Sequence, residues 1–135
     1  MIKPYNRISA VEYALKYALS PNPEYYFFGG IGGDCTNFTS QCLYAGSKVM
    51  NYDKYNGWYY SNVNSRSPSW TSVQFFQNFI LNNNSIGPFA KLVPQNEIEI
   101  GDLIQLKQRN IFNHSLIVPK IENNRIYIDK HRKSC

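Results

Sequence analysis

Apolar side chains recur at helical spacing near the amino end of the chain. Ser9-Ala-Val-Glu12 has the form of a capping box and predicts a helix that continues to about Leu19. The segment 20–23 holds two prolines and is expected to end that helix. The apolar stripe expected on its buried face consists of Val11, Ala14, Leu15, Ala18 and Leu19.

Two further helices are predicted in the middle of the chain. One runs from Thr36 to about Tyr44, and Gly46 has the residue type of a carboxyl-terminal cap. The other begins at Ser69 or Thr71 and ends near residue 81. The polar, aromatic segment 51–69 has no clear period and is predicted to be a long loop. The side chains expected to point inward are Phe38, Cys42 and Ala45 in the first helix, and Val73, Phe76, Phe79 and Ile80 in the second.

The last third of the chain has the short apolar runs of β-strands. We expect strands at 103–107, 115–118 and 125–129, with a hairpin turn over 122–125. Helices followed by an antiparallel sheet predict an α+β fold, and the length suits a single domain over residues 1–135.

Charge and composition narrow the range of partners. The net charge of +5 favours anionic partners, among them an anionic cell-wall polymer. The basic residues form no stripe, so we expect no nucleic acid, and an ordinary solvated basic surface is an equal alternative. No run of about 20 apolar residues is present, so no membrane span is expected. Residues 1–7 lack an apolar signal core, and we expect a cytoplasmic protein or one released by lysis or a dedicated route.

Cys35 is the leading candidate for chemistry. It follows the glycine-rich segment 29–33 and stands where a predicted helix begins. The amino end of a helix carries partial positive charge and free N–H groups, which stabilise a thiolate and can bind an oxyanion. Asp34 could cap the same helix. A lone cysteine can equally be a buried apolar residue, which is what we expect of Cys42.

A nucleophilic thiol needs a base, and the chain has two histidines. His114 begins an apolar strand, and His131 ends the next one. If the hairpin turns between Asn123 and Asn124, His114 lies near position 133 on the partner strand. Asp129 and His131 lie on the same face of that strand, because side chains two residues apart point to the same side. Either side chain could orient the imidazole. His114 could alternatively serve only to bond a backbone carbonyl. His131 and Cys135 could alternatively belong to a zinc site.

The segment around Cys35 resembles a known signature. Residues 32–41, Gly-Gly-Asp-Cys-Thr-Asn-Phe-Thr-Ser-Gln, are similar to the motif of the bacterial "putative amidase domain" family, which usually has Val where Thr39 stands. That family is related in pattern to the NlpC-type and CHAP cell-wall peptidases, which also share a Gly-Asp turn before the strand that bears the histidine. Further segments resemble the family's sequence and occur in the same order along the chain: 5–7, 58–60, 69–70, 101–104, 114–118 and 127–131.

The resemblance implies a papain-like cysteine peptidase fold and the cleavage of amide bonds, with peptidoglycan at the cell wall as the expected substrate. By the motif, Cys35 carries over as nucleophile and His114 as base. His131 carries over as the third, orienting residue, and Asp129 is the reserve. The resemblance implies no metal and no organic cofactor.

Aromatic side chains are the expected substrate contacts, because their faces stack on sugars and peptides. Packing in the core is the alternative for the same rings. A protease or transamidase acting on proteins, as an effector or toxin would, and a non-catalytic wall-binding module are the rival functions. An inhibitor protein is a further candidate partner. The expected substrate-binding residues are Asp34, Trp58, Tyr59, Tyr60 and Trp70.

Overall fold

A computed structural model gives the fold, and it describes residues 3–29 and 33–129. Nothing long and apolar enough to cross a membrane is found among the helices of this part of the chain. The elements in chain order are α1 (Arg7–Tyr17), α2 (Cys35–Ser47), β1 (Tyr60–Asn62), β2 (Ser65–Arg66), α3 (Pro68–Thr71), α4 (Val73–Asn82), a 3₁₀ turn (Gln95–Glu97), β3 (Leu103–Gln108), β4 (Ile111–Glu122) and β5 (Arg125–Asp129).

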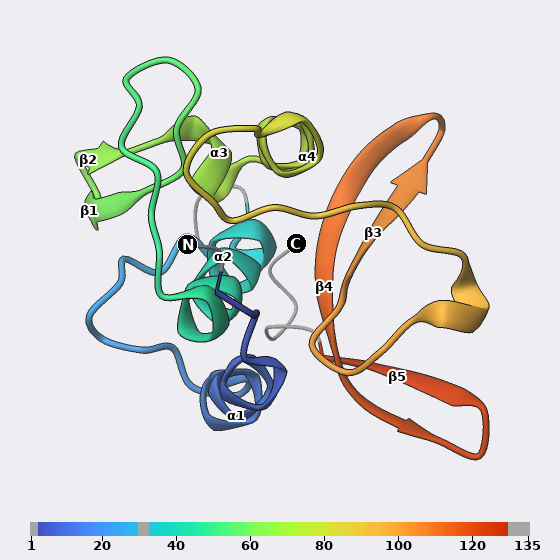
Figure 1. The fold of residues 1–135 in the computed structure, drawn as a ribbon. Helices are drawn as coiled ribbons and strands as arrows, with labels where there is room; N and C mark the ends of the chain where they lie inside the picture. Colours follow the sequence, from blue (N-terminus) through green and yellow to red (C-terminus); the bar gives the residue numbers. More distant parts are fainter. Residues whose placement is uncertain (1–2, 30–32, 130–135) are drawn as a thin grey trace.

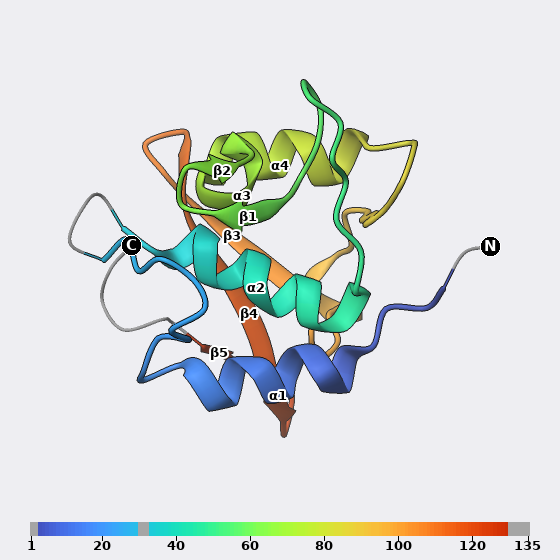
Figure 2. The ribbon, with the colours of Figure 1, turned by 90° about the vertical axis from the view of Figure 1, so that its left-hand side faces the viewer.

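Helix α2 lies in the middle of the molecule. Figure 1 shows it between α1 on one side and α3 and α4 on the other, with the sheet of β3, β4 and β5 alongside. In the turned view of Figure 2, α2 crosses the sheet, and residue contacts join it to α1, α3 and β4. The structure is therefore a mixed fold of helices and antiparallel sheets, as the sequence predicted.

The main sheet has the order β3–β4–β5, with both pairs antiparallel. The hairpin between β4 and β5 turns at Asn123 and Asn124, whose φ angles of 54° and 63° suit the tight turn that favours asparagine. The predicted hairpin and the strand 125–129 are confirmed. Strand β4 is far longer than the predicted 115–118, because its polar ends continue the pairing beyond the apolar run.

Two clusters of buried side chains lie on the two sides of α2. One joins α1, α2 and β4, and the other joins α2, α4 and the segment around β1 and α3. Leu103 on β3 and Tyr5, which precedes α1, each pack against both clusters. The first cluster consists of Ala10, Ala14, Phe38, Cys42 and Ile117, and the second of Leu43, Trp58, Tyr60, Trp70, Phe76, Phe79 and Ile80.

The first helix begins earlier than the capping box predicts. Asn6 is its N-cap, and the Asn6 side chain accepts a hydrogen bond from the Ser9 N–H at 2.9 Å. The buried face also differs from the expected stripe, because Leu15 and Leu19 are 63% and 84% exposed. Small side chains face α2 instead and let the two helices approach closely. They are Ala10 and Ala14, both fully covered.

Helix α2 runs through the glycine that was predicted to end it. A side chain at Gly46 would place its Cβ 2.3 Å from the Tyr5 ring and 2.7 Å from the Asn6 carbonyl oxygen. Gly46 is therefore required for close packing, and not for a turn. The helix ends at Lys48, which adopts the left-handed conformation with φ 57° and donates its N–H to the Tyr44 carbonyl.

The predicted long loop and third helix are both corrected. The segment 51–69 contains the short pair β1 and β2 and the start of α3. The helix expected up to residue 81 is broken at Ser72, where the extended backbone ends α3 and caps α4. Phe76, Phe79 and Ile80 are buried as predicted, whereas Val73 is half-buried.

The start of α1 is fastened to the turn that precedes β3. The Arg7 guanidinium donates to the Ile100 carbonyl at 2.9 Å and to the Asp102 carboxylate at 2.6 Å. Tyr5 donates its hydroxyl to the Gly101 carbonyl at 2.8 Å, and burial raises the Tyr5 pKa well above its usual value, so this donor stays protonated. Gly101 has φ +82°, a conformation that favours glycine.

Arg7→Met is expected to lower the free energy of unfolding by about 1–2 kcal/mol, because two charge-assisted bonds are lost while the pair is partly screened by solvent. Urea denaturation followed by circular dichroism measures this loss. Lys91→Met is the control, since Lys91 is exposed and makes no ion pair within the described residues. Equal midpoints for Arg7→Met and the control would contradict the proposed fastening role.

Candidate active site

Cys35 is the first residue of α2, the position that the sequence predicts for the nucleophile. The residue is 6% exposed, so only a small part of its surface reaches solvent. The next cysteine, Cys42, lies two turns along the helix and is fully covered in the cluster between α1 and β4. The two thiols therefore occupy different surroundings, one at the end of the helix and one in its apolar packing.

Asp34 is the N-cap residue of α2, but its carboxylate does not cap the helix backbone. Its Oδ1 accepts from the Phe28 N–H at 2.8 Å and from the Asn37 side-chain amide at 2.9 Å. Asp34 is 1% exposed. This corrects its predicted place among the substrate contacts: its carboxylate fixes the segment that enters the helix at Cys35.

Buried polar side chains continue along α2 and are bonded by the two tryptophans. Trp70 donates its indole N–H to Asn37 Oδ1 at 2.9 Å, and Trp58 donates its indole N–H to Ser40 Oγ at 3.2 Å. Ser40 in turn donates to the Trp70 carbonyl at 2.9 Å. On the opposite side Tyr13 donates to Gln41 Oε1 at 2.5 Å. The signature segment is thus held by indole and phenol donors from three other parts of the chain.

The same contacts correct the predicted aromatic groove. Trp58 and Trp70 are fully covered, with ring centroids 4.6 Å apart, so neither indole face is available for stacking on a substrate. Tyr60 is 8% exposed and accepts a hydrogen bond from the Tyr26 N–H through its hydroxyl. Tyr59 is half-buried and lines a surface hollow of about 590 Å³. Of the four rings, Tyr59 remains the candidate for a substrate contact.

A hydrogen bond joins the start of α2 to β4 beside both predicted catalytic residues. Thr36, which follows Cys35, and Ser115, which follows His114, have their hydroxyl oxygens 3.0 Å apart. Both residues are 2% exposed. Gln105 on β3 also donates to Ser115 Oγ at 3.1 Å and to the Val73 carbonyl at 3.2 Å. Thr36, Gln105 and Ser115, which are far apart in the sequence, are therefore held together between the start of α2 and β4.

The strand is irregular next to His114. In the β3–β4 ladder Leu106 pairs with His114 and Lys107 pairs with Phe112, so Asn113 is left out as a bulge. Regular alternation would point His114 and Ser115 to opposite faces of the sheet. Bulges bend a strand and re-aim neighbouring side chains, and they are common beside active sites. His114 itself is half-buried.

The predicted partner of His114 on β5 depends on a register that the structure changes. Lys120 pairs with Tyr127, but Asp129 pairs with Ile117, one step out of the regular ladder. Pro119 lies within the shift, and proline cannot donate an N–H to a ladder. Asp129 is thus three residues from His114 along β4, about 10 Å of strand. The regular register that the prediction assumes is therefore interrupted at Pro119, between the hairpin and His114.

The third predicted residue and the alternative zinc pair both fall in the segment 130–135. His131 and Cys135 lie outside the described residues, and so does the predicted pairing at position 133. Between residues 3 and 129, apart from 30–32, no group of three or more histidine, cysteine, aspartate and glutamate side chains is arranged so that it could hold a metal ion.

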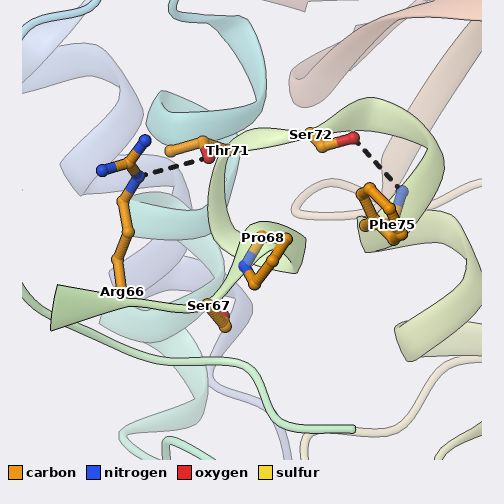
Figure 3. A pocket seen from close by; sticks show the side chains of 6 residues that line it. All are labelled: Arg66, Ser67, Pro68, Thr71, Ser72 and Phe75. Carbon is orange, nitrogen blue, oxygen red and sulfur yellow. Dashed lines mark hydrogen bonds between the residues drawn. The ribbon is translucent and has the colours of Figure 1, made fainter. Parts of the chain in front are cut away.

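A pocket that the sequence analysis did not predict lies between β2, α3 and the start of α4. Figure 3 shows Arg66 reaching toward Thr71 at its rim. The Arg66 guanidinium also lies over the Phe28 ring, 4.7 Å from its centre. An isolated arginine in a polar segment carries no periodic signal, so only the fold reveals this placement.

Comparison with known proteins gives a family for nearly the whole chain. Residues 4–134 match the family described as "Putative amidase domain". The chain is 33% identical to the Bacillus subtilis (strain 168) "Uncharacterized protein YhbB" over 84% of its own length and 37% of the relative. It is 27% identical to "Uncharacterized protein YjcM" of the same strain, over 96% of its length and 31% of the relative. The chain therefore spans about a third of each of these curated relatives. No solved structure matches it.

Two threonines one turn apart in α2 provide a matched test of the buried polar contacts. Thr36→Val removes a hydroxyl bonded to Ser115 and should lower the free energy of unfolding by about 1–2 kcal/mol. Thr39 Oγ1 is buried and has no hydrogen-bond partner within the described part of the chain. Thr39→Val should therefore raise the free energy of unfolding, by about 1 kcal/mol.

Urea denaturation of the two variants and the wild-type protein measures both changes. Opposite signs are expected, because the substitution is the same and only the bonding of the hydroxyl differs. A loss of stability of equal size in both variants would show that the Thr36–Ser115 contact contributes nothing specific.

Proposed function

The chain belongs to the "Putative amidase domain" family, and from this we propose that it hydrolyses amide bonds through Cys35 as nucleophile and His114 as base. We further propose that it does so on a papain-like scaffold, in which a helix that begins with the nucleophile packs against the strand that carries the base. The names of the two relatives state no activity, so beyond the family the proposal depends on the geometry of this chain.

The observation that carries the proposal is the bond between Thr36 and Ser115. The two residues are the immediate neighbours of Cys35 and His114, and 79 positions separate them in the sequence. A buried contact between hydroxyls holds the first turn of α2 against this point of β4. It supports a thiol and an imidazole that act as a pair, the arrangement required of a cysteine nucleophile.

The bulge at Asn113 supports the same pairing. Because Ser115 faces α2, an undistorted strand would turn His114 away from the helix. The ladder is regular at His114 and Ser115 and shifts directly before them, at Asn113, and we propose that the added local twist of this bulge brings the imidazole within reach of Cys35. Asn113 donates its side-chain amide to Gln108 at 2.7 Å, which holds the bulge from the neighbouring strand.

The proposed reaction has two steps. His114 takes the proton from the Cys35 sulfur, the thiolate adds to the amide carbonyl carbon, and the amine leaves with the proton that the imidazole returns. The product is a thioester. A water molecule then gives a proton to His114 and attacks the thioester carbonyl, which releases the acid and restores the thiol. The N–H groups at the start of α2 face the oxyanion in both steps.

The third residue is proposed as His131, with Asp129 in reserve. An orienting group fixes the tautomer of the base and stabilises its positive charge. The register shift at Pro119 weakens the case for Asp129, because its backbone lies about 10 Å along the strand from His114. His131 is the residue that the family motif indicates, and it lies outside the described residues.

The proposed substrate is the peptide part of peptidoglycan. The family supports an amide as the bond that is cleaved, and the basic net charge of +5 suits an anionic wall. Tyr59 at the rim of its hollow is the aromatic side chain proposed to contact this substrate.

Cys35→Ala should abolish the release of peptides from purified cell walls, because it removes the sulfur that is proposed to form the thioester. His114→Gln should lower the rate by a factor of about 10²–10⁴, the range for a lost general base. Mass spectrometry of the soluble muropeptides measures both effects. The control is Cys42→Ala, which removes the covered thiol of the same helix.

Full peptide release by Cys35→Ala would refute the mechanism. Loss of release in Cys42→Ala, with an unchanged unfolding transition, would show that the thiol chemistry had been assigned to the wrong residue. Cleavage of protein substrates but not of walls would leave the proposed mechanism standing and show that the substrate is a protein and not peptidoglycan.

Alkylation offers a test that needs no substrate. Iodoacetamide at pH 6 should modify Cys35 faster than Cys42, because a helix start favours the reactive thiolate and Cys42 is fully covered. Peptide mapping by mass spectrometry follows each cysteine separately. Both should react alike in denaturant. Equal slow rates in the native protein would favour a non-catalytic binding module.

A further inference from the structure

The pocket beside Arg66 is a small, partly polar hollow of about 330 Å³ (Figure 3). Its walls come from the end of β2, from α3 and from the first turn of α4. Hydroxyl groups and one guanidinium provide the polar part, and a proline and an aromatic ring provide the rest. The lining residues are Arg66, Ser67, Pro68, Thr71, Ser72 and Phe75.

Arg66 is held in place by neutral partners. Its Nε donates to Thr71 Oγ1 at 3.4 Å, and its Nη1 donates to the Val63 carbonyl. Phe28 supports one face of the guanidinium. The ion pairs found in the described residues join Arg7 or Lys120 to carboxylates, and none includes Arg66. The Arg66 guanidinium is therefore held in one orientation, and no carboxylate of the described residues forms an ion pair with it.

One series of contacts leads from this pocket to Cys35. The Arg66 guanidinium lies over Phe28, and the Phe28 N–H donates to Asp34 Oδ1 at 2.8 Å. Asp34 directly precedes Cys35. Only one ring contact and one hydrogen bond therefore separate the guanidinium from the residue next to the proposed nucleophile.

A second series leads from the opposite wall of the pocket to His114. Thr71 and Ser72 precede Val73, whose carbonyl accepts from Gln105 at 3.2 Å. Gln105 also donates to Ser115 Oγ, next to His114. The two walls of the pocket are therefore connected, through bonded residues, to the neighbours of both proposed catalytic residues.

We propose that this pocket is a substrate subsite and that Arg66 binds a carboxylate of the peptide close to the amide that is cleaved. This deepens the proposed function and rests on it. A planar guanidinium with two fixed N–H directions suits a carboxylate, which can accept two parallel bonds. The Phe28 ring and the Thr71 hydroxyl keep the guanidinium in one orientation, so less side-chain entropy is lost on binding.

The test compares two substrates and several variants. The substrates are a muropeptide that the wild-type protein cleaves and the same muropeptide with its carboxylates converted to carboxamides. Wild-type protein should show kcat/KM about ten- to a hundredfold higher for the carboxylate form, the range for a charged hydrogen bond. Arg66→Gln should bring the ratio of the two values close to one, mainly through KM for the carboxylate form. Arg66→Lys should keep part of the preference.

The matched control is Arg125→Gln, which removes the same charge at the exposed β4–β5 hairpin. It should leave the ratio unchanged. A merely structural role of Arg66 would lower both values of kcat/KM together and keep their ratio, so this ratio separates recognition of the carboxylate from support of the fold.

Binding to Cys35→Ala, measured by calorimetry with the same two muropeptides, separates failure of the subsite from failure of the chemistry. Tighter binding of the carboxylate form, lost in Cys35→Ala/Arg66→Gln, supports the subsite even if Cys35 proves not to be the nucleophile. Equal kcat/KM and equal affinity for both forms would overturn the subsite and leave the amidase proposal standing.

Discussion

Helix α2 is buried on all sides although much of it is polar. Ten of its 13 residues are buried, and five of these carry hydroxyl or amide groups, namely Thr36, Asn37, Thr39, Ser40 and Gln41. An unsatisfied buried polar group costs about 1–3 kcal/mol, so such a helix can occupy the centre only if the surrounding elements supply partners. Partners for four of the five come from α1, from the loop before α2, from the tryptophans around α3 and from β4, and Thr39 is the exception within the described residues. The arrangement of the elements around α2 follows from this requirement.

The constraint explains what the signature around Cys35 does. Asp34 and Asn37 bind the incoming loop, Ser40 and Asn37 bind the two indoles, and Thr36 binds Ser115. These polar residues position the start of the helix. Cys35 is the proposed reactive group at that start, and its position results from bonds made by its neighbours. Orientation set by the folded core in this way reduces the entropy cost of bringing a nucleophile and its base together.

Local patterns in the sequence predicted a large part of this fold. The positions of β3 and β5, the asparagine hairpin, the buried face of α4 and the helix start at Cys35 followed from periodicity, turn residues and a motif. The failures came from long-range contacts. Gly46 looked like a cap because its close packing against Tyr5 has no local signal. Trp58 and Trp70 looked like groove residues because nothing local indicates that their N–H groups serve buried acceptors on α2. The shift at Pro119 could have been foreseen, since proline interrupts a ladder; the extrapolation of the register ignored it.

The rigid and the adaptable parts of the proposed site lie on different elements, and this has a consequence for specificity. The proposed nucleophile and base lie on α2 and β4, which buried hydrogen bonds join to each other and to their neighbours. Arg66, Thr71 and Tyr59 lie on the short elements between residues 51 and 72, which pack against the core through the two tryptophans and leave polar side chains at the surface. If the proposed roles hold, substitutions at Tyr59 or Thr71 change what is recognised and leave the bonds between α2 and β4 intact. One scaffold of this kind could then keep its chemistry while its substrate changes, because the proposed reacting groups lie in the core and the proposed substrate contacts lie at the surface.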